Sequence, residues 1–236
     1  MTQISQNLEE IKGRIREAAL EAGRDPAEVR LVAVTKTVAL DRIQEAVAAG
    51  HTLFGENYVQ EAKRKVAALG PELTWHFIGN LQSNKAKAAV EFSDLIHSVD
   101  RLRLAQALEQ AASRRDKVQK ILLQVNLAGE ASKSGTAPEA APELLRAIRP
   151  MSHLQVVGLM TMPPWFDDPE RVRPYFRALR ELRDRLRDLQ VVDGDLPELS
   201  MGMTGDFEAA VAEGATLVRI GTAIFGRRPG QSCAAR

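Results

Sequence analysis

Short runs of strand-forming residues recur along the chain, and each precedes a segment whose apolar residues recur every three or four positions. The first pattern is typical of β-strands and the second of amphipathic helices. The pattern predicts strands over residues 31–35, 52–54, 74–78, 94–98, 119–126, 154–160, 197–201 and 216–220. It predicts helices over residues 39–49, 57–68, 83–91, 101–115, 138–149, 169–190 and 206–213.

Eight strands in this alternation, with no linkers between the units, predict an α/β fold, a single TIM-type (β/α)8 barrel. Residues 1–24 add an N-terminal helix, because their apolar residues share one helical stripe. The chain ends before an eighth helix is evident, so the N-terminal helix either takes that place or covers the barrel floor. We expect a single barrel domain over 1–236, with a flexible tail over 229–236. An open, doubly wound sheet is the alternative.

Composition and charge narrow the range of functions. The chain has 32 basic and 31 acidic residues and a net charge of +1, which gives no electrostatic basis for binding nucleic acid or an anionic membrane. The single cysteine, Cys233, excludes an internal disulfide and a multi-thiolate zinc site, and no His/Asp/Glu spacing suggests another metal site. The N-terminus has no apolar signal segment, and no stretch is long enough to span a bilayer, so we expect a cytoplasmic protein.

A single lysine follows the first predicted strand, at the end where such barrels carry their functional groups. Alternation places Val32, Val34 and Lys36 on one face of the strand. If this face points inward, Lys36 emerges at the mouth of the barrel. Desolvation would lower its pKa from about 10.4 and make the neutral amine available to form a Schiff base with a carbonyl group. The alternative is a lysine whose stem packs while its ammonium group reaches water.

The last predicted strand brings a second cation to the same place. Leu217 and Arg219 share a face by alternation, and in a closed barrel this strand pairs with the first, so Arg219 becomes a neighbour of Lys36. Two converging cations repel each other unless an anionic or polarisable ligand lies between them. An arginine paired with a carboxylate for structural reasons is the alternative.

Glycine-rich loops follow the last two strands, "LSMGMTGD" (199–206) and "IGTAIFG" (220–226). Glycines let the backbone approach a ligand, successive N–H groups bind anions, and Ser200 and Thr222 add hydroxyl groups. TIM barrels often hold a phosphate at these loops. A ligand with an aldehyde for the lysine and a phosphate for the loops is pyridoxal 5'-phosphate (PLP). Arg219 could face its ring nitrogen and keep it unprotonated, which weakens the ring as an electron sink.

These residues also resemble a known family. From about residue 7 to residue 228 the chain is similar to the YggS/PROSC-type pyridoxal phosphate homeostasis proteins, which resemble the barrel domain of alanine racemase. The matching motifs are "WHFIGNLQSNK" (75–85), the most specific, with "AVTKT" (33–37), "FGENYVQEA" (54–62), "QVNLAGEASKSG" (124–135), "GLMTM" (158–162), "LSMGMTGDFEAA" (199–210) and "VRIGTAIFG" (218–226). The resemblance implies a Schiff base on Lys36 and a cofactor site made of Lys36, Asn57, Met160, Ser200, Met201, Arg219, Gly221 and Thr222.

The resemblance implies a role in vitamin B6 balance, with PLP as the cofactor and no established turnover of a substrate. Thr204 stands where the family pattern has a serine and keeps the hydroxyl group. The segment 129–136 resembles the family's flexible loop, which places Lys133 near the mouth. The implied partners are PLP and, transiently, PLP-dependent apoenzymes, and a lone barrel without the racemase's second domain favours a monomer.

Racemisation requires a proton donor on each face of the cofactor, and Lys36 supplies only one of them. The residues themselves therefore argue against a racemase. The candidate for a second base is Tyr58 at a helix start, since Tyr175 lies within a charged helix. His76 is expected to be a hydrogen-bonding wall residue of the mouth rather than a general base. We therefore predict a non-catalytic PLP binder or carrier with no catalytic residue. The alternative is a PLP-dependent amino-acid racemase or another Schiff-base enzyme. A third interpretation, an aldolase-like lysine without a cofactor, is less favoured because two loops suited to phosphate lie beside the lysine.

Overall fold

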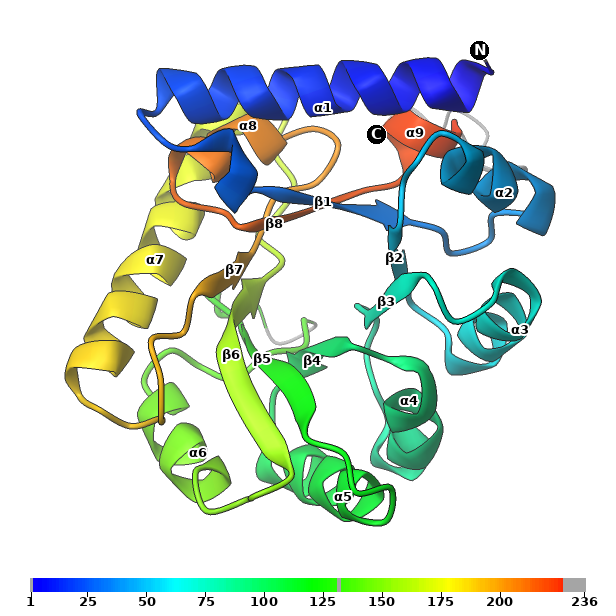
Figure 1. Ribbon diagram of the computed structural model, residues 1–236. Helices are drawn as coiled ribbons and strands as arrows, with labels where there is room; N and C mark the ends of the chain where they lie inside the picture. Colours follow the sequence, from blue (N-terminus) through cyan, green and yellow to red (C-terminus); the bar gives the residue numbers. More distant parts are fainter. Residues whose placement is uncertain (1, 131–132, 227–236) are drawn as a thin grey trace.

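The computed structural model describes residues 2–130 and 133–226, and the strands of this part of the chain form a closed barrel (Figure 1). They are β1 (Arg30–Val34), β2 (Leu53–Glu56), β3 (Thr74–Phe77), β4 (Leu95–Val99), β5 (Gln119–Val125), β6 (Leu154–Thr161), β7 (Glu198–Ser200) and β8 (Leu217–Ile220). Neighbouring strands are parallel, and the ring closes where β8 pairs with β1, with Val32 beside Arg219. The predicted barrel is confirmed. The open sheet is wrong, because its first and last strands would not pair.

One helix follows each strand, and α1 precedes them all. The helices are α1 (Gln3–Glu21), α2 (Leu40–Ala48), α3 (Val59–Leu69), α4 (Ala86–Phe92), α5 (Leu102–Ser113), α6 (Ala141–Ile148), α7 (Arg173–Asp188), α8 (Phe207–Ala212) and α9 (Thr222–Phe225). Short 3-10 turns are formed by Pro26–Glu28, Ser83–Lys85 and Pro169–Arg171. The predicted tail over 229–236, including Cys233, lies outside the described residues.

The N-terminal helix α1 lies along the outside of the barrel, across α8 and α9 (Figure 1). The side-chain amide of Asn7 donates to the carbonyl of Ile224 in α9 at 2.8 Å, and Arg14 forms an ion pair with Glu208 in α8. The last helix, α9, has only four residues. Because α9 is too short to cover β8 and β1, α1 completes this part of the wall and does not cover the barrel floor.

Alternation along the strands divides the buried side chains into two layers. The larger layer lies between strands and helices and includes Leu31 and Ala33 of β1. The apolar cluster inside the barrel is small and consists of Val32, Leu95, Leu122, Met160 and Leu217. The remaining interior is polar, with His76, His97, Ser200 and Arg219 all buried. Buried polar groups require hydrogen-bond partners, so their arrangement is specific.

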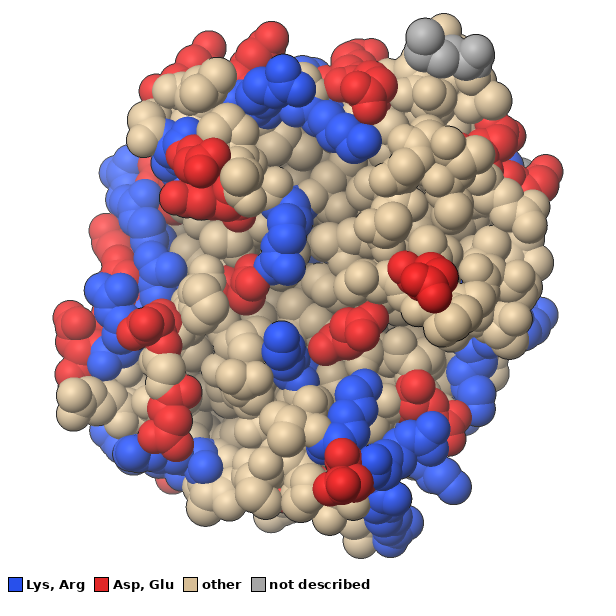
Figure 2. Space-filling model, in the orientation of Figure 1, with Lys and Arg blue, Asp and Glu red and all other residues tan. Residues whose placement is uncertain are grey.

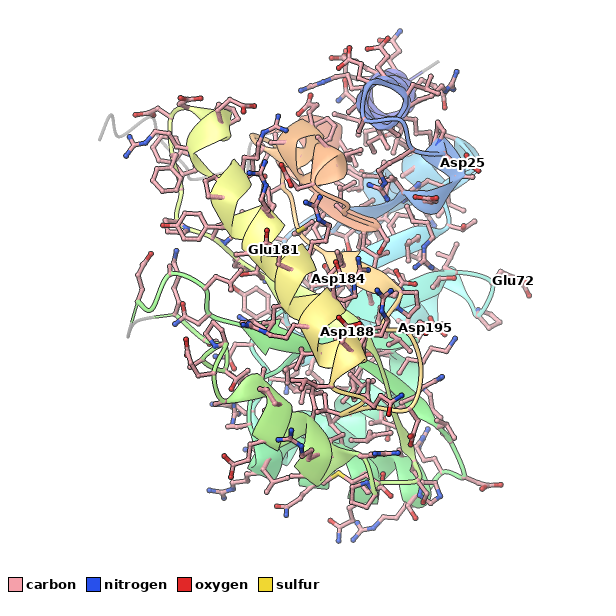
Figure 3. All side chains as sticks on the ribbon, turned by 90° about the vertical axis from the view of Figure 1, so that its left-hand side faces the viewer. Asp25, Glu72, Glu181, Asp184, Asp188 and Asp195 are labelled. Atoms are coloured by element: carbon pink, nitrogen blue, oxygen red, sulfur yellow. The ribbon has the colours of Figure 1, made fainter. Side chains whose placement is uncertain are left out.

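The two ends of the barrel carry different loops. Asp25, Glu72 and Asp195, which precede β1, β3 and β7, lie together at one end in Figure 3. The loops that follow the strands therefore gather at the other end. On the face shown in Figure 2, acidic and basic side chains are interleaved, consistent with 32 basic and 31 acidic residues. Within the described residues, no helix combines the length and apolar character needed to cross a membrane.

Candidate functional site

A pocket of about 280 Å³ opens where the strands end, between loops that follow β1, β2, β3, β6, β7 and β8. This volume lies close to the lower limit of ordinary small-molecule sites, roughly 300 Å³. Among the residues predicted for the site, those that line the pocket are Lys36, Asn57, Arg219, Gly221 and Thr222. The pocket therefore lies where the sequence predicted it.

Lys36 follows β1 and belongs to the pocket wall. Val32 lies inside the barrel, whereas the Thr35 hydroxyl donates to Glu56 outside it, at 2.6 Å. This alternation places Lys36 on the inward side of the wall, as predicted. Its side chain is half-buried and shares the pocket with Arg219. The two cations that are far apart in sequence thus face one cavity.

Arg219 on β8 is 5% exposed and forms the inner wall of the pocket. Its guanidinium donates to Ser200 Oγ at 2.5 Å and to the Thr161 carbonyl at 3.0 Å. Burial lowers the pKa of Arg219 to about 10, while the nearby Asp206 carboxylate raises it. The group therefore stays a cation at neutral pH. Within the described residues Arg219 forms no ion pair with a carboxylate, and its partners are Ser200 and Thr161. The alternative of an arginine paired with a carboxylate for structural reasons is therefore wrong.

Ser200 belongs to a chain of hydrogen bonds that crosses the barrel interior. His97 Nδ1 lies 2.9 Å from Ser200 Oγ, and His97 Nε2 lies 3.0 Å from His76 Nδ1. Ser200 Oγ accepts from Arg219, so the Ser200 hydroxyl can donate its own proton to His97 Nδ1. We therefore assign the His97 proton to Nε2, which donates to His76 Nδ1. Burial lowers the pKa of His76 to about 3 and the pKa of His97 well below its ordinary value. Both imidazoles are therefore neutral, and the chain orients the Ser200 hydroxyl that accepts from Arg219.

Three residues predicted for the site do not line the pocket. Ser200 is fully buried with its hydroxyl committed to Arg219 and His97. Met160 lies in the small apolar cluster inside the barrel, and Met201 packs in the outer layer against the helices. His76, expected at the mouth, is 3% exposed and lies within the hydrogen-bond chain instead. Strand alternation gives the face of Met160, Ser200 and His76 but not their depth in the barrel. Met201 differs for another reason, because it follows Ser200 and alternation directs it outward.

The loop after β7 contributes Met203, Thr204, Gly205 and Asp206 to the pocket, and the loop after β8 contributes Gly221 and Thr222. A Cβ on Gly221 would lie 3.1 Å from the Val34 carbonyl oxygen, so glycine lets β8 end against β1. Asp206 Oδ1 accepts from the Met203 N–H at 2.6 Å, which folds the β7 loop. Burial raises the pKa of Asp206, because desolvation disfavours the carboxylate.

Asn57 lines the pocket and carries a buried polar atom without a partner. Its Oδ1 is buried and accepts no hydrogen bond. The backbone of Asn57 is packed so closely that a Cβ on Gly79 would lie 2.3 Å from its carbonyl oxygen. Asn57 Oδ1 has almost no accessible surface, so a ligand in the pocket would reach it only after the side chain turns. The adjacent Tyr58 is 58% exposed and does not line the pocket.

Sequence reasoning missed the loop after β6. Met162, Trp165 and Phe166 line the pocket, and Trp165 is 76% exposed at its entrance. The signal was present, because two prolines and two aromatic residues follow directly on a strand end in "TMPPWF". Lys133 is not part of the pocket and pairs with Glu130 at 3.0 Å, while residues 131–132 lie outside the described residues. No metal-binding group of His, Cys, Asp and Glu occurs in the described chain.

Residues 6–229 match the family described as alanine racemase, N-terminal domain. A protein of Pseudomonas aeruginosa named pyridoxal phosphate homeostasis protein is 48% identical over 97% of this chain and 97% of its own length. A protein of Aquifex aeolicus with the same name is 46% identical over 94% of this chain and 97% of its own length.

A solved structure of PipY from Synechococcus elongatus, described as having PLP bound, superposes with a TM-score of 0.82. It is 39% identical to this chain, and the match covers 94% of this chain and 100% of PipY. The barrel, the pocket and near-complete coverage by relatives lead to one assignment. The chain belongs to the alanine racemase N-terminal domain family and, within it, to the pyridoxal phosphate homeostasis proteins.

Proposed function

We propose that this chain binds PLP in the pocket and acts in PLP homeostasis as a binder or carrier. The observation that carries the proposal is the convergence of Lys36 and Arg219 on one cavity between the β7 and β8 loops. Two cations and the backbone N–H groups of two glycine-containing loops suit an anionic ligand. The half-buried amine of Lys36 suits an aldehyde. The relatives named for PLP homeostasis and the PipY structure support the same ligand.

Lys36 is the proposed attachment point. Its amine would hold the aldehyde of PLP as a Schiff base, with the carbonyl oxygen released as water. The half-buried position beside the aromatic β6 loop limits access of bulk water to this bond. When bound, PLP supplies an electron-withdrawing ring, the property that most PLP enzymes exploit.

Arg219 is proposed to donate to the pyridine nitrogen. A guanidinium with a pKa of about 10 does not give up its proton to a pyridine, so the ring nitrogen accepts a hydrogen bond and stays unprotonated. The hydrogen bonds to Ser200 and Thr161 hold the guanidinium from behind. An unprotonated ring is a weaker electron sink, which suits storage of the cofactor better than turnover.

Other residues would hold the remaining groups of the ligand. Asn57 lines the pocket, and its Oδ1, which has no partner, would accept from the ligand once the side chain turns toward it. The hydroxyl groups of Thr204 and Thr222 and the backbone at Gly205 and Gly221 suit the phosphate. Thr204 takes the role first expected of Ser200, whose hydroxyl group is already committed inside the barrel.

We propose that the protein does not turn over amino acids. The relatives are named for homeostasis rather than for a reaction. Tyr58, the candidate second base, is exposed and absent from the pocket wall. We further propose a cytoplasmic monomer that passes PLP transiently to PLP-dependent apoenzymes, since the mouth of a lone barrel remains open to a recipient.

Absorption spectroscopy tests the attachment. Protein incubated with PLP should show the visible band of a Schiff base, and borohydride should fix the cofactor to the peptide that contains Lys36. Lys36→Ala should abolish the band, and Lys133→Ala should retain it, since Lys133 pairs with Glu130 outside the pocket. A wild-type protein that stays colourless with PLP would refute the proposal.

A second measurement separates the carrier from an enzyme. The PLP-loaded protein is incubated with single L-amino acids, and the enantiomers are separated over time. The proposal expects no sustained formation of the D-form. Sustained turnover that disappears in both Lys36→Ala and Tyr58→Phe would establish a racemase instead.

A further inference from the structure

A buried ion cluster lies behind the turn that carries Lys36, on the outer side of the barrel wall. It consists of Lys65 and Glu61 on α3 and Glu56 at the end of β2, and we call it the Lys65 cluster. Lys65 is 5% exposed and Glu56 is fully buried. None of the three residues lines the pocket. Burial of several ionisable groups is unfavourable unless they are paired and hydrogen-bonded. The cluster meets this condition except at Glu56 Oε2, which is buried without a hydrogen-bond partner.

The ammonium group of Lys65 uses three hydrogen bonds. Nζ donates to Glu56 Oε1 at 2.7 Å, to Glu61 Oε1 at 2.6 Å and to the Thr35 carbonyl at 2.6 Å. The Thr35 hydroxyl donates to the same Glu56 oxygen at 2.6 Å. Glu61 Oε1 in addition accepts from the backbone N–H of Thr37 at 2.7 Å. The cluster therefore holds the residue before the pocket lysine and the residue after it.

The turn held in this way has an unusual backbone. The Thr35 carbonyl accepts from the Val38 N–H at 2.9 Å, which closes a turn around Lys36 and Thr37. Thr37 has a φ of 63°, in the left-handed region that β-branched residues rarely adopt. A backbone in such a conformation persists only where its surroundings hold it. The bond from the Thr37 N–H to Glu61 is the contact that does so at this residue.

We propose that the Lys65 cluster positions Lys36 for reaction with the aldehyde of a phosphate-bearing ligand. The cluster fixes both flanking peptides, so it fixes the direction in which the Lys36 side chain leaves the wall. Lys65 and Glu61 are positioning residues, since they act through the turn and do not reach the pocket. The inference deepens the proposed function and rests on it for the identity of the aldehyde. Effective reaction requires that amine and carbonyl be held in a near-attack arrangement.

The test compares variants of Glu61 with a control on the same helix. Glu61→Ala removes the acceptor of the Thr37 N–H, and Glu61→Gln keeps an oxygen at that position. The side chain of Glu61 is 18% exposed, so its loss leaves no deeply buried void. Lys63→Met is the control, because Lys63 lies on α3 but pairs with Glu91 at the surface, at 2.8 Å. Far-UV circular dichroism and thermal unfolding verify that each variant folds.

The first readout is the rate at which the Schiff-base band appears after PLP is added. Glu61→Ala should slow this rate on the order of tenfold, Glu61→Gln should restore most of it, and Lys63→Met should match the wild type. A purely structural role would not produce rescue by the amide. Equal rates in the wild type and Glu61→Ala would overturn the inference.

The second readout uses no cofactor. Competitive acylation followed by peptide mass spectrometry gives the reactivity of Lys36 relative to Lys63 in the same molecule. This ratio should change in Glu61→Ala and remain at the wild-type value in Glu61→Gln. An unchanged ratio in the alanine variant would overturn the inference. A wild type without any band would refute the proposed function alone, and the acylation ratio would still decide on positioning.

If Glu61→Ala does not fold, Thr35→Val replaces it. This nearly isosteric change removes the bond from the Thr35 hydroxyl to Glu56 at 2.6 Å and its longer contact with the Gly55 carbonyl at 3.3 Å. It should move the band rate and the acylation ratio in the same direction, by roughly threefold. A folded Thr35→Val with wild-type values in both measurements would overturn the inference.

Discussion

His51 provides a quantitative test of the reasoning about buried groups. It lies just before β2 and is 6% exposed, with its ring edge-on to Phe54 at 5.2 Å between centroids. Its Nε2 donates to the Leu53 carbonyl at 2.7 Å. Burial, and to a smaller extent the charge of Lys12, lower the pKa of His51 to about 4. The folded protein therefore keeps this ring neutral at a pH at which an unfolded chain protonates it.

The sign and size of the effect follow from this difference. An unfolded histidine has a pKa near 6.5, so below this pH the unfolded state binds a proton that the folded state does not. Stability is therefore lost as the pH falls from about 6.5 to about 4, and the loss levels off once the folded ring is also protonated. Between pH 7 and pH 5 the loss from one such histidine is about 2 kcal/mol. This is a large part of a total stability of roughly 5–15 kcal/mol.

Urea unfolding of the wild type and His51→Gln at pH 7 and pH 5 isolates this contribution. Glutamine keeps an N–H for the Leu53 carbonyl but does not titrate. Glu56 and Asp206, whose pKa values burial raises, act in the opposite direction, but they are common to both proteins and cancel in the difference. The wild type should lose about 2 kcal/mol more than the variant over this interval. Two parallel pH profiles would refute the argument.

Three further predictions concern other buried and exposed positions. Ser200→Ala leaves Arg219 and His97 without their shared hydrogen-bond partner. It should lower the free energy of unfolding, measured in urea, by about 1–3 kcal/mol. The control is Ser98→Ala, which should change this free energy little, because the buried Ser98 hydroxyl has no partner. Gly158→Ala places a Cβ 1.9 Å from the Glu198 carbonyl oxygen and should destabilise the protein by about 3 kcal/mol or more in urea unfolding. Gly13→Ala adds a Cβ in open space on α1 and should stabilise the protein by about 0.5–1 kcal/mol in the same assay. PLP should quench the fluorescence of Trp165 at the pocket, and Trp165→Phe should remove most of this quenching in a titration.

Much of the site was predictable because it depends on strand alternation and on barrel closure. Alternation alone separates Val32 and Lys36 from Thr35, and closure alone makes β8 the neighbour of β1. Both rules are local or topological, so they can be read from periodicity. The motifs that resemble the family lead to the same lysine and the same glycine loops.

The depth of each side chain was not predictable. Ser200 and Thr204 lie four residues apart in one loop region, and both carry hydroxyl groups. Only the packed barrel shows that His97 on β4 reaches across to Ser200, while Thr204 lines the pocket. Contacts between β4 and β7 depend on the curvature of the closed sheet, which no sequence period records. The same holds for the Lys65 cluster, where α3 brings two charges against the turn after β1.

The sequence by itself determined the order of strands and helices, the closed barrel and the end at which Lys36 and Arg219 meet. These follow from hydrophobic periodicity, because burial of apolar faces is the dominant force and its period is written along the chain. The tertiary structure decided which polar groups reach the pocket, which are consumed inside the barrel and which hold the Lys36 turn from behind. Hydrogen bonds between distant strands require distances of about 3 Å, and only the packed backbone sets such distances.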